Sequence, residues 1–429
     1  MIASANRIRC GQRMRTALTC ALTLAIVLAT AAKVARAQAP SDSLVISVIT
    51  MGPGEEIFER FGHISIRVRD LRTGVDSAYN WGMFSFSQPR FLQRFLTGDT
   101  RYWMQGFPTL PLVDQIYRRF GRWVTEQELA LTPGQADSLW RFIQWNVREE
   151  NRYYRYDYFR DNCATRVRDA IDMVLGGALK RAVIAHEHGV TFRDETLRLG
   201  VAYPLLDFGM DFVQGRRSDA TMSAWEEMFV PMRVLELLRD VKVRREDGTM
   251  GRLVRAERRL VVDQRFAEAD APPDYVLPAL AAGLGLAGTL LVLSLGAARS
   301  GAARVGIATL GTAWHLVAGT VGVFVLYLGL FTRHTFFAQN NNMLLATPAS
   351  LALAILFPLA IARPSPRIVR AAFALSVIAA ICAIVAVALR SVPSLSQQNR
   401  PLLALAVPVQ LASAFALWRA TTARRAGTP

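Results

Sequence analysis

Residues 276–298 read VLPALAAGLGLAGTLLVLSLGAA, an uncharged apolar stretch that exceeds the ~20 residues a helix needs to cross a bilayer. Similar stretches follow at 305–331, 344–362, 370–389 and 402–418. No Asp or Glu occurs from Val276 onward. We therefore predict an all-α transmembrane bundle of about five helices over residues 276–429. Because the last stretch is short and contains Pro408, four spans are the alternative.

The arginines indicate how this bundle is oriented. If the chain before Val276 is outside, eight arginines fall in cytoplasmic segments and only Arg333, Arg390 and Arg400 fall in outer loops. Cytoplasmic loops of membrane proteins carry the excess of Lys and Arg. We therefore expect a cytoplasmic C-terminus and an extracytoplasmic N-terminal domain.

The N-terminus has the three parts of a secretory signal peptide. A segment with four arginines, residues 7–15, precedes an apolar run at 17–32, and Ala35-Arg36-Ala37 offers a small-residue cleavage site. We predict a signal peptide over residues 1–37 and an exported domain over 38–275. An uncleaved anchor is the alternative.

The net charge of +16 does not indicate nucleic-acid binding. Six basic residues lie within residues 1–37 and eleven lie from Val276 onward, and neither segment contains an acidic residue. The domain between them has a net charge of about −1, so it has no basic field to attract a polyanion. We expect no nucleic-acid partner.

The exported domain is expected to be α+β, with its strands before its helices. Residues 44–50 (LVISVIT), 63–69 (HISIRVR) and 77–86 (SAYNWGMFSF) have the composition of strands. From Pro89 the pattern becomes helical and continues into a basic-aromatic stretch at 117–123.

Two helices are predicted most clearly in the second half of this domain. One opens at Thr132-Pro133, as an N-cap followed by Pro at the first helical position. The other opens at Cys163, with Asp161 or Asn162 as its cap, and ends at Gly176-Gly177.

Cys163 is the only cysteine of the exported domain, because Cys10 and Cys20 lie in the signal segment and Cys382 lies in a predicted span. It therefore has no intramolecular disulfide partner in a compartment where disulfides form. An isolated cysteine is often a small buried apolar residue. Here it lies in the polar stretch YFRDNCATR, residues 158–166. The start of a helix favours the thiolate and offers N–H groups to an oxyanion, so we predict a nucleophile.

A nucleophilic thiol needs a base, and the domain contains three histidines. His63 begins a predicted strand after Phe61-Gly62, whereas His186 and His188 lie in an irregular segment. We therefore expect His63 to be the base. Asn80 on the returning strand could orient its ring as a third member of the site.

Other arrangements of these side chains are open. Asp76 or Asp161 could replace Asn80 as the third member. A zinc site formed by the three histidines and a carboxylate is a weaker alternative, because the sequence has neither His-Glu-x-x-His nor Cys-x-x-Cys. We expect no metal and no cofactor.

Three groups of motifs stand out in the exported domain: Pro53-Gly-Glu-Glu with Phe61-Gly-His-Ile-Ser-Ile-Arg-Val68, Ala78-Tyr-Asn-Trp-Gly-Met-Phe84, and Tyr153-Tyr-Arg-Tyr-Asp-Tyr-Phe159 leading into Asp161-Asn-Cys-Ala-Thr-Arg166. Together they resemble the Lnb-type lipoprotein N-acyltransferases. The segment from Thr332 to Pro348 also looks like the family's outer loop between the second and third spans. That family joins an N-terminal periplasmic domain to a five-helix membrane domain, so the resemblance covers nearly the whole mature chain.

The resemblance implies a permuted papain-like (NlpC/P60-like) thiol fold in a protein of the bacterial inner membrane. The catalytic pair falls on Cys163 and His63, and the third residue is left unassigned. The implied reaction moves an acyl chain from a phospholipid, through a Cys163 thioester, to the N-terminal amine of a diacylated lipoprotein. Candidate substrate-binding residues are Asn162 and Arg166 in the cysteine motif and His334 and Asn342 in the outer loop.

Two other functions stay open. A cell-wall amidase or endopeptidase of the NlpC/P60 kind would use the same pair with water as acceptor, although such an enzyme needs at most one membrane anchor. An envelope scaffold would leave Cys163 a structural residue, which its polar surroundings argue against. His315, inside a predicted span, is a further functional candidate, because ionisable groups are costly there, but a neutral ring bonded to a neighbouring helix is the alternative.

Overall fold

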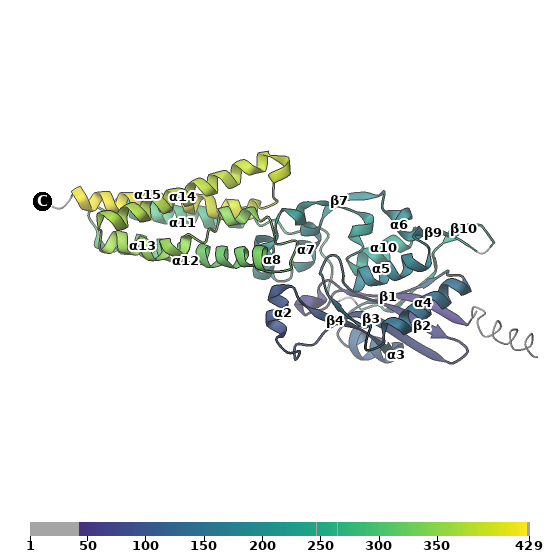
Figure 1. The fold of residues 1–429 in the computed structure, drawn as a ribbon. Coiled ribbons are helices and arrows are strands. Elements are labelled where there is room, and N and C mark those ends of the chain that lie inside the picture. The colour runs from purple at the N-terminus through teal and green to yellow at the C-terminus, as the bar shows by residue number, and fades with distance from the viewer. Residues whose placement is uncertain (1–42, 246, 264, 427–429) are drawn as a thin grey trace, which may run out of the picture.

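The computed structural model describes residues 43–245, 247–263 and 265–426. A mixed domain of strands and helices is followed, from Val276 onward, by a bundle of apolar helices (Figure 1). This confirms the predicted fold class of an α and β domain followed by an all-helical region. The predicted signal peptide, residues 1–37, lies outside the described residues.

The centre of the mixed domain is a seven-stranded antiparallel sheet with the order β11-β5-β1-β2-β3-β4-β6. Its strands are β1 (Leu44–Met51), β2 (His63–Asp70), β3 (Val75–Met83), β4 (Arg101–Pro108), β5 (Val124–Leu129), β6 (Tyr153–Arg155) and β11 (Val254–Val261). Two small sheets pair β7 (Glu187–Thr191) with β8 (Thr221–Ser223), and β9 (Lys242–Arg244) with β10 (Met250–Arg252).

The prediction that strands precede helices is wrong, because β4, β5, β6 and β11 follow or interrupt the helices. The sequence of β5 (VTEQEL) has no apolar face. The strand is nevertheless buried, because its Glu126 is neutralised by Arg67, at 3.0 Å, and by Arg258 of β11, at 3.1 Å. Strands whose burial depends on ion pairs do not show alternating hydrophobicity. The stretch 117–123 is accordingly split between a π-helical turn, Val113–Arg118, and the approach to β5.

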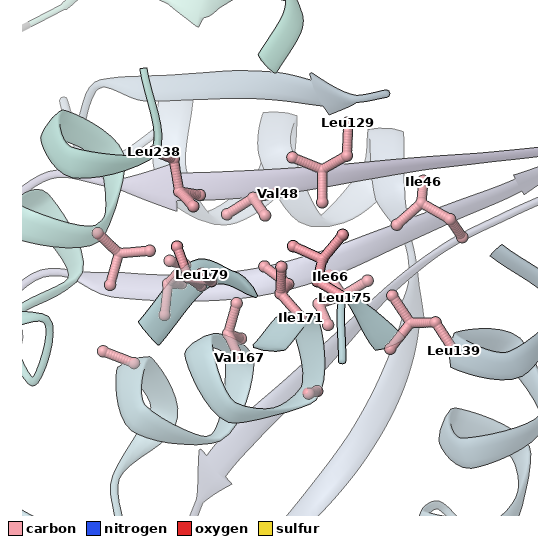
Figure 2. Close-up of a cluster of buried hydrophobic side chains, with 14 of the residues drawn as sticks. Ile46, Val48, Ile66, Leu129, Leu139, Val167, Ile171, Leu175, Leu179 and Leu238 are labelled. Carbon is pink, nitrogen blue, oxygen red and sulfur yellow. The ribbon is translucent and has the colours of Figure 1, made fainter. Parts of the chain in front are cut away.

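Helices cover one face of the sheet and form the main core (Figure 2). Alternate residues of β2 point to this face and meet the apolar stripe of α5 (Cys163–Val174). The residues in this contact are Ile64, Ile66, Val68, Val167, Ala170 and Ile171. α4 (Pro133–Asn146) packs beside α5, and Thr132 caps it with Pro133 at its first position, as predicted.

The remaining helices of this domain are short. They are α2 (Phe91–Thr97), α3 (Thr109–Leu112), α6 (Ala178–Val183), α7 (Phe192–Gly200), α8 (Pro204–Val213), α9 (Ala224–Glu227) and α10 (Pro231–Leu238). In Figure 1, α2, α7 and α8 lie at the end of the domain that is closest to the apolar helices.

The C-terminal helices coincide with the predicted apolar stretches. They are α11 (Val276–Gly296), α12 (Gly301–Phe331), α13 (Ser350–Ala362), α14 (Pro366–Ala388) and α15 (Arg400–Ala426). Four of them are long and apolar enough to cross a membrane, whereas α13 is shorter. We expected the last stretch to be the short one, but α15 continues through Pro408. The third is short because residues 341–344 form a 3-10 turn and α13 begins only at Ser350.

His315 lies in the core of this bundle, where its Nε2 is 2.9 Å from the hydroxyl of Ser413 on α15. This contact between α12 and α15 matches the alternative in which the ring bonds to a neighbouring helix.

Candidate active site

Helix α5 begins at Cys163 because Asn162 caps it. The Asn162 side-chain oxygen accepts from the backbone N–H of Thr165 at 2.9 Å. Its amide nitrogen donates to the carbonyl oxygens of Tyr158 and Phe229, at 2.8 and 2.9 Å. Both side-chain donors of Asn162 are therefore occupied in fixing the start of the helix, and neither is free for the substrate contact that we expected.

His63 and Asn80 come from neighbouring strands and form a hydrogen bond. His63 opens β2, and Asn80 lies opposite Ser65 on β3. The distance between His63 Nε2 and Asn80 Oδ1 is 3.1 Å. The amide nitrogen of Asn80 donates to the Ala78 carbonyl at 3.0 Å, which directs the side-chain oxygen to the imidazole. Because that oxygen only accepts, the ring proton resides on Nε2 and Nδ1 keeps its lone pair.

The sulfur of Cys163 lies beside the strand that His63 opens. The backbone N–H of Ile64, the residue after His63, is directed at this sulfur, as are the N–H groups of Cys163 and Ala164. Gly82 of β3 keeps the space next to Cys163 open, because a Cβ there would lie 3.4 Å from the Cys163 Cβ. The structure thus brings the three predicted catalytic residues into one neighbourhood, where β2, β3 and α5 meet.

Burial controls the charge of both reactive groups. It raises the pKa of the Cys163 thiol to about 11, although the surrounding N–H groups favour the thiolate and oppose this rise. Burial, with a smaller contribution from the charge of Arg122, lowers the pKa of the His63 imidazole to about 4, against the bond to Asn80, which raises it. The N–H groups at the helix start thus act on the thiol pKa in the expected direction, but burial outweighs them in the free protein. Both shifts favour the neutral forms, the thiol of Cys163 and the imidazole of His63, near neutral pH.

Arg122 belongs to this neighbourhood, although its sequence context did not single it out. Its buried side chain donates to the Gly52 carbonyl at 2.9 Å, pairs with Glu59 at 2.8 Å and lies over the ring of Tyr117. Among the described residues, its second terminal nitrogen is buried without a hydrogen-bond partner. Since Arg122 lies in the stretch 117–123, which was expected to continue a helical pattern, nothing separated it from the exposed arginines nearby.

The carboxylates considered as alternatives to Asn80 have other partners. Asp76 binds Arg67 at 2.7 Å, and Asp161 binds Arg166 at 2.7 Å. The guanidinium of Arg166 also lies over the ring of Tyr154, 4.2 Å from its centroid. Arg166 therefore contacts Tyr154 next to the site, and its charge is already neutralised by Asp161.

The other two histidines of the mixed domain lie in an irregular segment and in β7. His188 binds the buried carboxylate of Glu227, with 2.9 Å between Nδ1 and each oxygen. Within the described parts of the chain, no three His, Cys, Asp or Glu side chains are grouped as a metal site requires.

The two outer-loop residues lie in separate contacts. His334 Nε2 is 3.1 Å from the Phe95 carbonyl oxygen of α2, and its ring stacks on Tyr158. Asn342 is fully buried, donates to the Phe212 carbonyl at 2.9 Å and accepts from Asn399 at 2.8 Å. His334 therefore reaches the side of the domain that carries the cysteine motif, whereas Asn342 fastens α8 to the apolar bundle.

Comparison with known proteins bears on the mixed domain and on the apolar helices. Residues 31–194 match the model of the Lnb N-terminal periplasmic domain, and this range contains His63, Asn80 and Cys163. Curated proteins gave no match to the chain, and solved structures gave none either. Beyond the matched range, the described part of the chain contains four helices that are long and apolar enough to cross a membrane. Residues 31–194 are thus similar to the periplasmic domain of the Lnb proteins, and apolar helices follow them in the chain.

Proposed function

We propose that this protein is a membrane-bound N-acyltransferase that uses Cys163 as its acyl carrier. The donor would be a phospholipid, and the acceptor would be the N-terminal amine of a diacylated lipoprotein. The observation that supports this most is the hydrogen bond between His63 and Asn80, 3.1 Å long, beside a buried unpaired thiol in an Lnb domain. A base whose tautomer is held by a neighbouring amide is the arrangement that thiol acyltransfer requires.

In the first half-reaction, His63 Nδ1 takes the proton of the Cys163 thiol as the sulfur attacks the ester carbonyl carbon of the phospholipid. The N–H groups at the start of α5 stabilise the oxyanion that forms. When the carbon–oxygen bond breaks, His63 returns the proton to the departing oxygen. The products are a lysophospholipid and a thioester on Cys163.

In the second half-reaction, the α-amine of the lipoprotein attacks the thioester carbonyl carbon. His63 takes one proton from the amine nitrogen, the carbon–sulfur bond breaks, and an amide remains on the lipoprotein. The proton then returns to the sulfur. Because the pKa of this thiol is about 11, protonating the departing sulfur makes it a much better leaving group.

The architecture supports acyl transfer over the alternative, a cell-wall thiol amidase or endopeptidase. Phospholipids and lipoproteins both lie at the membrane surface, so a thiol held there by several apolar helices gains proximity to both. Cys163 is also buried and His63 is partly buried, which restricts the access of water. A wall hydrolase would need neither feature.

We further propose that cleavage after Ala37 leaves residues 38–275 as a periplasmic domain that stays joined to the bundle, and that the bundle spans the inner membrane several times. The arginine distribution supports a cytoplasmic C-terminus. An alkaline phosphatase fusion after Ala271 should then be active, and one after Arg425 should be inactive. The reverse pattern would contradict this topology.

The reaction can be tested with the purified full chain, phospholipid vesicles, a diacyl lipopeptide and peptidoglycan, with products identified by mass spectrometry. We expect a triacylated lipopeptide together with lysophospholipid. Without the lipopeptide, an acyl adduct that hydroxylamine removes should accumulate on Cys163.

Variants separate the proposed roles in this assay. Cys163→Ala should form no adduct, and His63→Ala should form it ~10²–10⁴-fold more slowly, which is the usual contribution of general-base catalysis. Cys382→Ala, which changes a cysteine inside the apolar bundle, is the matched control and should react normally. Cleavage of peptidoglycan without acylation of the lipopeptide would rule out the acyltransferase function, and full transfer by Cys163→Ala would rule out the thioester mechanism.

A further inference from the structure

A cluster of aromatic side chains covers one end of the mixed domain. Its members come from the turn after β1, from the end of β3 and from α2: Phe58, Phe84, Phe86, Phe91, Leu92 and Phe95. We call this cluster the aromatic platform. Phe86 and Leu92 are 66% and 67% exposed, although the ring of Phe86 contacts Phe84 and Phe91, and Leu92 follows Phe91 on α2. Contiguous apolar side chains exposed in this way mark a surface that is covered by another molecule.

Ring contacts connect the platform to the reactive cysteine. Phe84 stacks on Tyr102 with 5.1 Å between centroids, and Tyr102 stacks on Tyr156 at 4.3 Å. The ring of Tyr156 lies 3.6 Å from the position of a Cβ at Gly82, on the side where that Cβ would approach Cys163. An unbroken row of aromatic rings therefore runs from the exposed platform to the space beside the thiol.

The platform also touches the apolar helices. The backbone N–H of Arg333, just after α12, donates to the Thr97 carbonyl of α2 at 2.9 Å, and His334 lies 3.1 Å from the Phe95 carbonyl. The last turn of α12 exposes Leu330 and Phe331. In Figure 1, α2 lies at the end of the domain that is closest to this helix. The platform is therefore continuous with a surface that a bilayer would cover.

The charges on the α2 side of the platform suit a phospholipid headgroup. Arg90 and Arg94 belong to the α2 region, and Arg333 follows α12. Asp99 is bound by Arg333 at 3.1 Å, whereas the exposed carboxylates Glu55 and Glu56 precede Phe58 and are not on α2. Basic side chains at the rim of an apolar surface bind phosphate while the apolar part meets acyl chains.

We infer that the aromatic platform enters the outer leaflet and takes an acyl chain of the donor phospholipid, which the row of rings guides to Cys163. This inference rests on the proposed function and adds the place where the donor binds. The occupant is the phospholipid chain, because the platform joins the surface of α12 at one edge and the thiol at the other. The faces of these rings offer apolar contact, which suits a hydrocarbon chain.

The binding site can be tested without any chemistry at the thiol. The full chain in vesicles of phosphatidylethanolamine and phosphatidylglycerol is irradiated with a phospholipid that carries a diazirine in its acyl chain. We expect labelled peptides to include residues 84–97. Labels confined to α11–α15, or labels on the platform only from a diazirine lipopeptide, would overturn the inference.

A second measurement connects the platform to the reaction. Phe86→Asp with Leu92→Asp should lower adduct formation on Cys163 by about tenfold or more, since loss of one buried apolar side chain corresponds to roughly that factor. The loss should be greater for long-chain than for short-chain donors, which separates binding of the acyl chain from the loss of the Phe86 ring contacts. Leu71→Asp is the matched control, because Leu71 is equally exposed, at 66%, in the turn between β2 and β3.

The two proposals fail in different ways. If the wild-type protein forms no adduct but the platform is labelled, the acyl-transfer function is wrong and the lipid site stands. If the adduct forms at the wild-type rate in the double variant, the platform is not the donor site, whereas the thioester mechanism stands.

Discussion

Asn80 keeps the ring proton of His63 on Nε2 through a hydrogen bond of 3.1 Å. The side-chain oxygen of Asn80 faces the ring because its amide nitrogen donates to the Ala78 carbonyl. The two residues lie at the end of β2 and on β3, with Tyr79 and Trp81 pointing into the core on the opposite face. This arrangement leaves Nδ1 as the nitrogen that can accept a proton. The position of a single amide therefore decides whether His63 can act as a base toward Cys163.

Asn80→Ala should slow acylation of Cys163 by ~10²-fold, the lower end of the usual contribution of general-base catalysis. The reason is that the ring loses its fixed tautomer, while no apolar packing is lost. Nitrogen NMR of labelled histidine should show a single Nε2–H tautomer in the wild type and a mixture in the variant. An unchanged rate with a mixed tautomer would exclude Asn80 from the positioning role.

The pH dependence of alkylation tests the charge of the thiol. Because burial raises the pKa of Cys163 to about 11, the thiolate fraction is small at pH 7 and grows as the pH rises toward that value. In a Cys382→Ser background, the rate of reaction with iodoacetamide should increase steadily from pH 7 to 10. A plateau that begins below pH 7 would instead indicate a preformed thiolate–imidazolium pair.

Arg122 should determine the pH at which the reaction rate falls on the acid side of the pH–rate profile. Its charge contributes to lowering the pKa of His63, which reaches about 4, so the base is neutral and competent at any pH well above that value. Arg122→Gln removes the charge and should move the acid limb of the rate profile to higher pH. Arg122→Lys keeps the charge and should leave the limb nearly where it is. A shift of equal size in both variants would mean that the packing of Arg122, rather than its charge, is responsible.

The sequence was informative where a local pattern determines the structure. The β2–β3 hairpin follows from alternating residues, and the start of α5 follows from Asn162 ahead of an apolar stripe. These two elements carry Cys163, His63 and Asn80, so the candidate site could be predicted from short segments. The five C-terminal helices could be predicted from the length of their apolar stretches alone.

The remaining features depend on contacts between distant segments. β5 is buried because Arg67 and Arg258 neutralise Glu126, and neither partner is near it in sequence. The pKa of Cys163 is raised because segments beyond its own helix enclose it, which a rule about helix starts does not include. Arg122 joins the site only after β5 places it beside β1.

Gly82 and Gly74 offer a matched pair for the space beside the thiol. Both have positive φ, +87° and +75°, so alanine at either position should cost about 1–2 kcal/mol of unfolding free energy. A Cβ at Gly74 would meet nothing within 4 Å, whereas a Cβ at Gly82 would lie 3.4 Å from the Cys163 Cβ and 3.6 Å from the Tyr156 ring. Chemical unfolding should therefore show similar losses, but only Gly82→Ala should lower adduct formation, and Gly82→Val should lower it further. If Gly74→Ala reduces the adduct as much as Gly82→Ala does, stability rather than the space at the sulfur would limit the reaction.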